Sequence, residues 1–132
     1  MQIFLYIVFC TILFVGGEKI DGMWNNHIGS HMFIEQLPQS PIVNGYYNSS
    51  VGGAKGTYPL NGLITTINEN QQIVTFCVVW QNQIADFMSG TCWTCTFDLK
   101  QDSITGMWIL RKQSYNEWNS TTVGVDIFKR SK

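Results

Sequence analysis

Charge of either sign is scarce in this sequence. Only 13% of its 132 residues are charged, and eight Lys and Arg stand against nine Asp and Glu, for a formal net charge of −1. A nucleic-acid partner requires a basic surface that neutralises phosphates, so this balance argues against one. The length is that of a single domain.

The sequence also lacks an apolar run long enough to cross a bilayer. Its longest run, residues 3–15, is interrupted only by Thr11 and is followed by Gly16 and Gly17. A membrane-spanning helix needs about 20 apolar residues, whereas a secretory signal has a shorter apolar core followed by small residues. We therefore expect residues 1–17 to be a signal peptide, and residues 18–132 to be a secreted domain without a membrane partner. A membrane anchor that is never cleaved is the alternative.

No segment has the apolar period of 3.6 residues that is typical of an amphipathic helix. Short alternating stretches separated by turn residues predict strands instead. Closure of eight antiparallel strands removes the exposed edges of a sheet, so we expect an all-β fold, an up-and-down β-barrel. Such a barrel has room for one small ligand. The expected strands lie around residues 24–26, 30–34, 45–49, 58–66, 72–80, 86–98, 104–112 and 119–129.

Alternation along these strands predicts an unusual inward face. A plain core would be aliphatic, and a buried polar group without a partner costs about 1–3 kcal/mol. Aromatic walls with a few convergent polar groups are typical of a small-molecule pocket. The alternative is the opposite register in some strands, which would expose these groups to solvent. The inward set comprises Trp24, Trp80 and Trp108 with Asn26, Ser30, Tyr47, Ser49 and Asp126.

Cysteine is scarce after residue 17, where only Cys77, Cys92 and Cys95 remain. Three is an odd number, so not all of them can pair within one chain. On a strand, the Cα atoms of Cys92 and Cys95 would lie roughly 10 Å apart with side chains on opposite faces, beyond disulfide reach. We interpret these two as packing residues or as an interchain pair. A metal site that combines them with His27 and His31 lacks the usual ligand spacing and is not expected.

Few residues offer covalent chemistry. The two His and the carboxylates form no recognisable set of nucleophile, base and orienting group, which argues against an enzyme. In a secreted protein, the sequons that begin at Asn48 and Asn119 are candidate N-glycosylation sites.

Several segments resemble the avidin/streptavidin family in their order and spacing, and together they cover nearly all of residues 18–132. The resemblance implies a biotin-binding barrel with biotin as ligand and no cofactor. The segments are residues 22–32 (GMWNNHIGSHM), 45–52 (GYYNSSVG), 58–62 (YPLNG), 78–80 (VVW), 107–111 (MWILR) and 118–128 (WNSTTVGVDIF).

The resemblance implies how the ureido group of biotin is held. Asn26, Ser30 and Tyr47 match three donors to the ureido oxygen, and Ser49 and Asp126 match acceptors of its N–H groups. Donors that polarise the carbonyl make the N–H groups stronger donors to Asp126, so each bond strengthens the next.

The resemblance also implies partners for the rest of biotin. Trp80 and Trp108 match the indoles around its bicyclic ring. Gly53 matches a segment whose backbone N–H meets the carboxylate of the tail, and glycine there lets the backbone approach closely. Trp118 matches a residue that contributes to the binding site of a neighbouring subunit. The alternative is that Trp118 covers the mouth of its own barrel.

Outward-facing apolar residues match a patch between subunits in the family. Met107, Val123 and Val125 would be unexplained on the outside of a monomeric barrel, and a homotetramer accounts for them.

Three residues depart from the family pattern, one in the loop before the sixth expected strand and two at the start of that strand. Ile84 and Asp86 stand where a Ser and a Thr usually meet biotin, and Met88 stands where an aromatic wall residue is usual. A carboxylate near the anionic tail would repel it, and Met packs less rigidly than a ring. We therefore expect an affinity below the family's best.

Two other binding functions fit parts of the pattern. Gly22-Met23-Trp24 would also suit a lipocalin-like carrier, although the polar inward set argues against an apolar ligand. A structural module that kept the barrel and lost biotin would explain the three departures. If biotin is bound, the family suggests sequestration or defence as the purpose.

Overall fold

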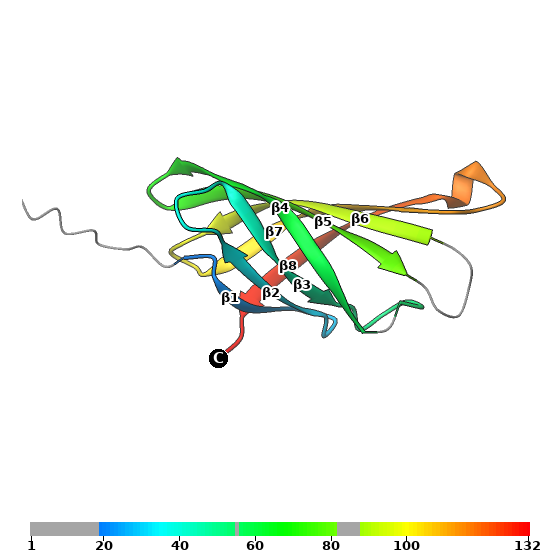
Figure 1. The fold of residues 1–132 in the computed structure, drawn as a ribbon, viewed down its shortest axis with the longest axis horizontal. Coiled ribbons are helices and arrows are strands. Elements are labelled where there is room, and N and C mark those ends of the chain that lie inside the picture. The colour runs from blue at the N-terminus through cyan, green and yellow to red at the C-terminus, as the bar shows by residue number, and fades with distance from the viewer. Residues whose placement is uncertain (1–18, 55, 82–87) are drawn as a thin grey trace, which may run out of the picture.

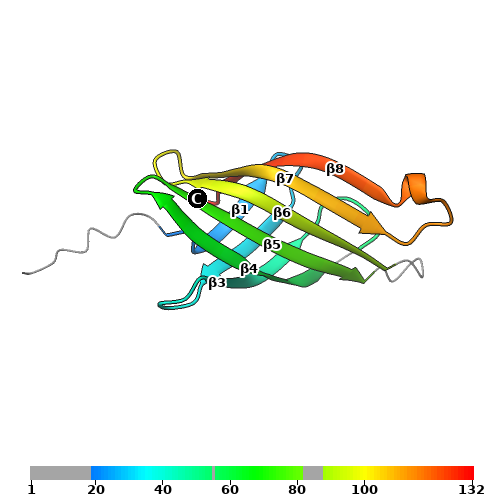
Figure 2. The same ribbon diagram turned by 90° about the horizontal axis from the view of Figure 1, so that it is seen from above.

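The structure, a computed structural model, describes residues 19–54, 56–81 and 88–132. Each strand pairs antiparallel with the next, and the last pairs with the first, so the sheet closes into a barrel (Figures 1 and 2). The predicted all-β, eight-stranded up-and-down barrel is confirmed. The elements are β1 Gly22–Asn26, β2 His31–Gln36, β3 Ile42–Asn48, β4 Thr57–Asn68, β5 Gln71–Gln81, β6 Met88–Asp98, β7 Ser103–Lys112, the 3-10 helix η1 Glu117–Asn119 and β8 Thr121–Arg130.

The last strand begins two residues later than the sequence predicts. Asn119 belongs to η1, in the connection that projects beyond the barrel between β7 and β8 (Figure 1). The Oδ1 atom of Asn116 accepts a hydrogen bond of 3.0 Å from the backbone N–H of Trp118. Such local bonds from side chain to backbone compete with strand formation, so β8 starts at Thr121.

Alternation along β5 and β6 builds an aromatic core. Val74, Phe76, Val78 and Trp80 are buried, and the residues between them are more exposed. Phe76 stacks on Trp93 of β6, with ring centroids 5.1 Å apart. The predicted inward face of β5 is therefore correct.

In the described ranges, no helix is long and apolar enough to cross a membrane.

One end of the barrel is closed around Trp24. This fully buried indole donates a hydrogen bond of 2.8 Å to the carbonyl oxygen of Ile20. The guanidinium of Arg130 lies 4.4 Å from the indole centroid, where a cation is attracted to the ring face. Arg130 also bonds both carboxylate oxygens of Asp102, at 2.7 and 2.9 Å, and donates to the carbonyl of Asp21. These bonds tie the N-terminal segment over this end.

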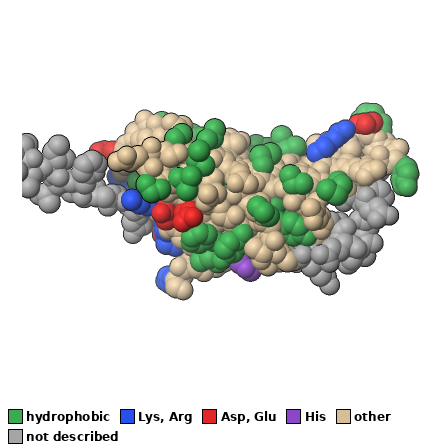
Figure 3. All heavy atoms as spheres, viewed as in Figure 1, with side chains coloured by type: hydrophobic (Ala, Val, Ile, Leu, Met, Phe, Trp, Pro, Cys, Tyr) green, Lys and Arg blue, Asp and Glu red, His purple; other side chains and the backbone are tan. Residues whose placement is uncertain are grey.

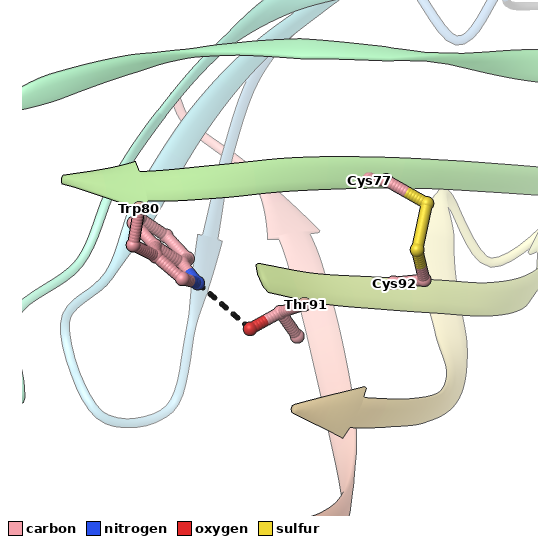
Figure 4. Close-up of a disulfide and its surroundings, with 4 residues drawn as sticks. All are labelled: Cys77, Trp80, Thr91 and Cys92. Carbon is pink, nitrogen blue, oxygen red and sulfur yellow. Dashed lines mark hydrogen bonds between the residues drawn. A yellow bond between two sulfur atoms is a disulfide. The ribbon is translucent and has the colours of Figure 1, made fainter. Parts of the chain in front are cut away.

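A disulfide between Cys77 and Cys92 joins β5 to β6 (Figure 4). The two residues are directly opposite in the ladder, with Cα atoms 4.1 Å apart. The interpretation of Cys92 as a packing residue or an interchain cysteine is therefore wrong, because it rested on spacing along one strand and not on the register between two. Cys95 does face the opposite side, as expected, and is buried with a free thiol.

Candidate functional site

A cavity of about 300 Å³ lies at the end of the barrel that carries the β1–β2 turn and the β3–β4 loop. This volume suits one small molecule. Most residues that the sequence predicts to contact a ligand line it, namely Asn26, Ser30, Tyr47, Ser49, Gly53, Trp80, Trp108 and Asp126.

A buried carboxylate, that of Asp126, forms the polar floor of the cavity and is 5% exposed. Its Oδ1 atom accepts a hydrogen bond of 3.2 Å from Nδ2 of Asn26, and its Oδ2 atom accepts one of 2.8 Å from Nε1 of Trp93. An ionised carboxylate has about four acceptor positions. Asp126 therefore keeps capacity to accept an N–H group from a ligand.

The orientation of the Asn26 amide follows from the β1–β2 turn. Its Oδ1 atom accepts hydrogen bonds from the backbone N–H groups of Ile28 and Ser30, at 3.2 and 2.9 Å. Because backbone N–H groups can only donate, the amide oxygen must face them and the NH₂ group must face Asp126. The turn thus presents an N–H donor beside the carboxylate.

Ser30 and Tyr47 add hydroxyl groups to the same wall. The Oγ atom of Ser30 accepts a hydrogen bond of 3.0 Å from the backbone N–H of Ser50, at the start of the β3–β4 loop. Burial, and then the charge of Asp126, raise the pKa of Tyr47 above its ordinary value, against a smaller opposing effect of its hydrogen bond with Ser30. Tyr47 therefore stays protonated at neutral pH and remains a hydrogen-bond donor.

Aromatic rings form the remaining walls and hold one another in place. Nε1 of Trp80 donates a hydrogen bond of 2.8 Å to Oγ1 of Thr91 on the neighbouring strand (Figure 4). Tyr47 meets Trp80 edge-on at 5.6 Å between centroids and stacks on Trp93 at 4.9 Å. These contacts fix the rings before any ligand arrives, which lowers the entropic cost of binding.

This combination of fold and cavity has known counterparts. The sequence profile described as "Avidin family" matches residues 16–131. The chain belongs to the avidin family. The family match does not support the lipocalin-like alternative.

Individual members of the avidin family are moderately similar to the chain. Hoefavidin from Hoeflea phototrophica is 47% identical over 64 residues, which cover 46% of this chain and only 37% of Hoefavidin. Avidin from Gallus gallus is 28% identical over 120 residues, or 85% of this chain and 78% of avidin. The X-ray structure of a biotin binding protein from chicken superposes with a TM-score of 0.69 and 27% identity, and covers 88% of this chain and 98% of that one.

Three cavity residues on β6 were not expected from the sequence: Ser89, Thr91 and Trp93. The assignment of the Ser and Thr positions to Ile84 and Asp86 led away from them, and those two lie outside the described residues. In the part of the chain that the structure describes, β6 brings a Ser and a Thr to the cavity, Ser89 and Thr91. Alternation back from buried Phe97 would have found all three residues.

Met88 is not the wall residue that the sequence suggested. Its side chain is 54% exposed and does not line the cavity, because it alternates with inward-facing Ser89. Of the two residues expected to weaken affinity, Met88 faces away from the cavity, and Asp86 lies outside the described residues.

Other residues complete the mouth or lie behind the wall. His27 and Ile28 of the β1–β2 turn line the mouth, although the sequence singled out neither as a ligand contact.

Burial, and then the charge of Asp126, raise the pKa of the Cys95 thiol to about 12. Cys95 is therefore un-ionised at neutral pH and a poor nucleophile.

The residues assigned to a subunit interface are all exposed, and Val125 also borders the cavity. Met107, Val123 and Val125 are between 57% and 58% exposed on β7 and β8, and apolar side chains dot the outer surface of the barrel (Figure 3). Trp118 on η1 is 91% exposed and does not line the cavity of its own barrel, so the alternative of a local lid is not what the structure shows. Of the two sequon residues, Asn48 ends β3 and Asn119 ends η1.

Proposed function

We propose that the protein binds biotin non-covalently in this cavity and acts by binding and not by catalysis. The observation that carries the proposal is the buried Asp126 carboxylate, next to the amide NH₂ group of Asn26 and within a wall of hydroxyl groups. A ureido group presents one carbonyl acceptor and two N–H donors. The cavity offers donors for the carbonyl oxygen in Asn26, Ser30 and Tyr47, and acceptors for the two N–H groups in Ser49 and Asp126.

Asn26, Ser30 and Tyr47 would donate to the ureido oxygen, and Ser49 and Asp126 would accept from its N–H groups. Asn26 has an NH₂ group directed at this region, and Tyr47 is held protonated. The bonds would form in a partly dry site, where charge-assisted hydrogen bonds are stronger than in water.

The bicyclic ring of biotin would lie between the indoles of Trp80 and Trp108, with Thr91 and Trp93 deeper in the cavity. The tail would run past Gly53 in the β3–β4 loop, whose backbone N–H would meet its carboxylate. The resemblance assigns Asp86 to the ligand, so its carboxylate would lie near the tail of biotin. Met88 would not touch the ligand.

Secretion and assembly complete the proposal. A structural disulfide forms and persists in oxidising compartments, so the Cys77–Cys92 bond supports an extracellular location with residues 1–17 as the signal peptide. In that compartment, Asn48 and Asn119 would be the acceptors of N-linked glycans. The apolar patch of Met107, Val123 and Val125 supports a homotetramer in which Trp118 closes a neighbour's cavity. Sequestration of biotin, or defence, would be the purpose.

Calorimetric titration of the mature protein with biotin tests the proposal. We expect one site per chain, and at least about tenfold weaker binding by Asp126→Asn, because the amide replaces an acceptor of a charge-assisted bond. Glu35→Gln is a matched control, since it makes the same change at an exposed carboxylate on β2 that does not line the cavity. If the native protein takes up no biotin, or if Asp126→Asn binds it as the control does, the proposal is wrong.

A further inference from the structure

One rung of the β7–β8 ladder places Trp108 directly opposite Gly124. Trp108 lines the cavity, and Gly124 does not. The three heavy atoms nearest to a Cβ atom built on Gly124 all belong to the indole of Trp108: Cζ2 is the closest, Cε2 lies 2.5 Å away and Nε1 lies 2.9 Å away. The ring therefore occupies the space that any side chain at position 124 would need.

The need for glycine at this position is steric and not conformational. Gly124 does not have the positive φ that Gly29 and Gly52 adopt, so its backbone would accept an L side chain. It also differs from Gly45 and Gly62, where an added Cβ would run into a backbone carbonyl of the neighbouring strand. At Gly124 the obstacle is a side chain of the cavity wall.

We propose that Gly124 is a positioning residue for ligand binding: it lets the Trp108 indole lie back against β8 and so sets the width of the cavity. The inference rests on the proposed function for its ligand, because the bicyclic ring of biotin would occupy the space beside this indole. An added methyl group at Gly124 pushes the indole toward the interior, since β8 itself blocks movement the other way. The cavity of about 300 Å³ is at the lower end of the range for small-molecule pockets, so a displaced ring would narrow it appreciably.

Gly124→Ala is the first variant to measure, by titration with biotin. Displacing a packed ring is costly, so we expect binding weaker by roughly tenfold or more. Gly90→Ala is the matched control, since its Cβ would meet only the carbonyl oxygen of Val78, at 3.6 Å, and Gly90 does not line the cavity. We expect Gly90→Ala to bind biotin as the native protein does.

A double-mutant cycle distinguishes positioning from a general structural role. Trp108→Ala is expected to weaken binding by itself, and it removes every ring atom that the added methyl group would meet. Gly124→Ala added to Trp108→Ala is then expected to weaken binding by less than threefold further. An equal loss on both backgrounds would mean that Gly124 acts through the backbone, and would overturn the proposal.

A measurement without ligand keeps the inference separate from the proposed function. The near-ultraviolet circular dichroism that Trp108 contributes, taken as the native spectrum minus that of Trp108→Phe, reports the setting of its ring. We expect this difference spectrum to change when it is measured in the Gly124→Ala background and to stay the same in the Gly90→Ala background. If the native protein fails to bind biotin, the proposed function fails, and this spectrum still decides the role of Gly124: an unchanged difference spectrum would refute it.

Discussion

The Nε1 atom of Trp93 lies 2.8 Å from Oδ2 of Asp126 and donates a hydrogen bond to it. Trp93 is also stacked between Phe76 and Tyr47, at centroid distances of 5.1 and 4.9 Å. The cavity carboxylate is thus tied to the aromatic core of the barrel. Its orientation is set by the packing of a ring and not by a flexible partner.

Replacement of Trp93 by Phe tests this tie. The phenyl ring keeps part of the stacking but leaves Oδ2 of Asp126 without its indole donor, which costs about 1–3 kcal/mol for a buried group. We expect the free energy of unfolding, measured with urea, to fall by that amount. Trp118→Phe is the control, because Trp118 is 91% exposed. Equal stability of the two variants would show that the bond contributes nothing.

The Cys77–Cys92 disulfide closes a short loop, with a sequence separation of 15. A loop of this length predicts a stabilisation of about 3 kcal/mol, mainly through the unfolded chain. We expect a reductant to lower the urea midpoint of the native protein and to have no effect on a Cys77→Ala/Cys92→Ala variant. A native midpoint that does not respond to complete reduction, verified by thiol titration, would contradict this.

Alkaline pH is predicted to destabilise the protein through Cys95. Burial, and then the charge of Asp126, raise the pKa of this thiol from 9.0 to about 12. Between these values the folded state keeps a proton that the unfolded state has lost, so the stabilisation is complete below pH 9 and disappears as the pH rises toward 12. Tyr47, whose pKa is also raised, adds to the same trend at higher pH. Unfolding curves between pH 8 and about 11 should show a shallower decline for Cys95→Ala than for the native protein. Identical slopes would rule out the thiol as a contributor.

The proposed homotetramer predicts a definite mass in solution. Light scattering on the mature protein should give about four chains per particle, as expected for a closed symmetric assembly. Val123→Arg should reduce the mass, because it places a charge in the apolar patch on β8. Thr122→Arg, next to it on the same strand, is the control for added charge. A native protein that runs as a monomer at micromolar concentration would refute the assembly.

Much of the architecture follows from local pattern. Alternation placed Phe76, Val78 and Trp80 on one face of β5, and the structure agrees. The inward position of Asp126 also follows from its place two residues before buried Phe128. Such positions depend only on the period of a strand, which a single sequence reveals.

Features that depend on register or loop length were not predictable in this way. The Cys77–Cys92 bond needs the pairing of β5 with β6, which no pattern within either strand specifies. Thr91 and Trp93 were missed because the resemblance assigned the ligand contacts of this part of the chain to Ile84 and Asp86. A shift of a few residues in one loop changes which side chains reach the cavity, even when every strand is correctly expected.

Recognition of the ureido group is the central claim, and one comparison tests it most directly. Biotin and lipoic acid carry the same valerate tail, but lipoic acid has a dithiolane ring and no ureido group. Titration calorimetry of the native protein should show biotin binding at one site per chain, with lipoic acid at least about 100-fold weaker, because the analogue leaves buried polar groups such as Asp126 unpaired. Equal affinity for the two acids, or no binding of biotin, would contradict the account.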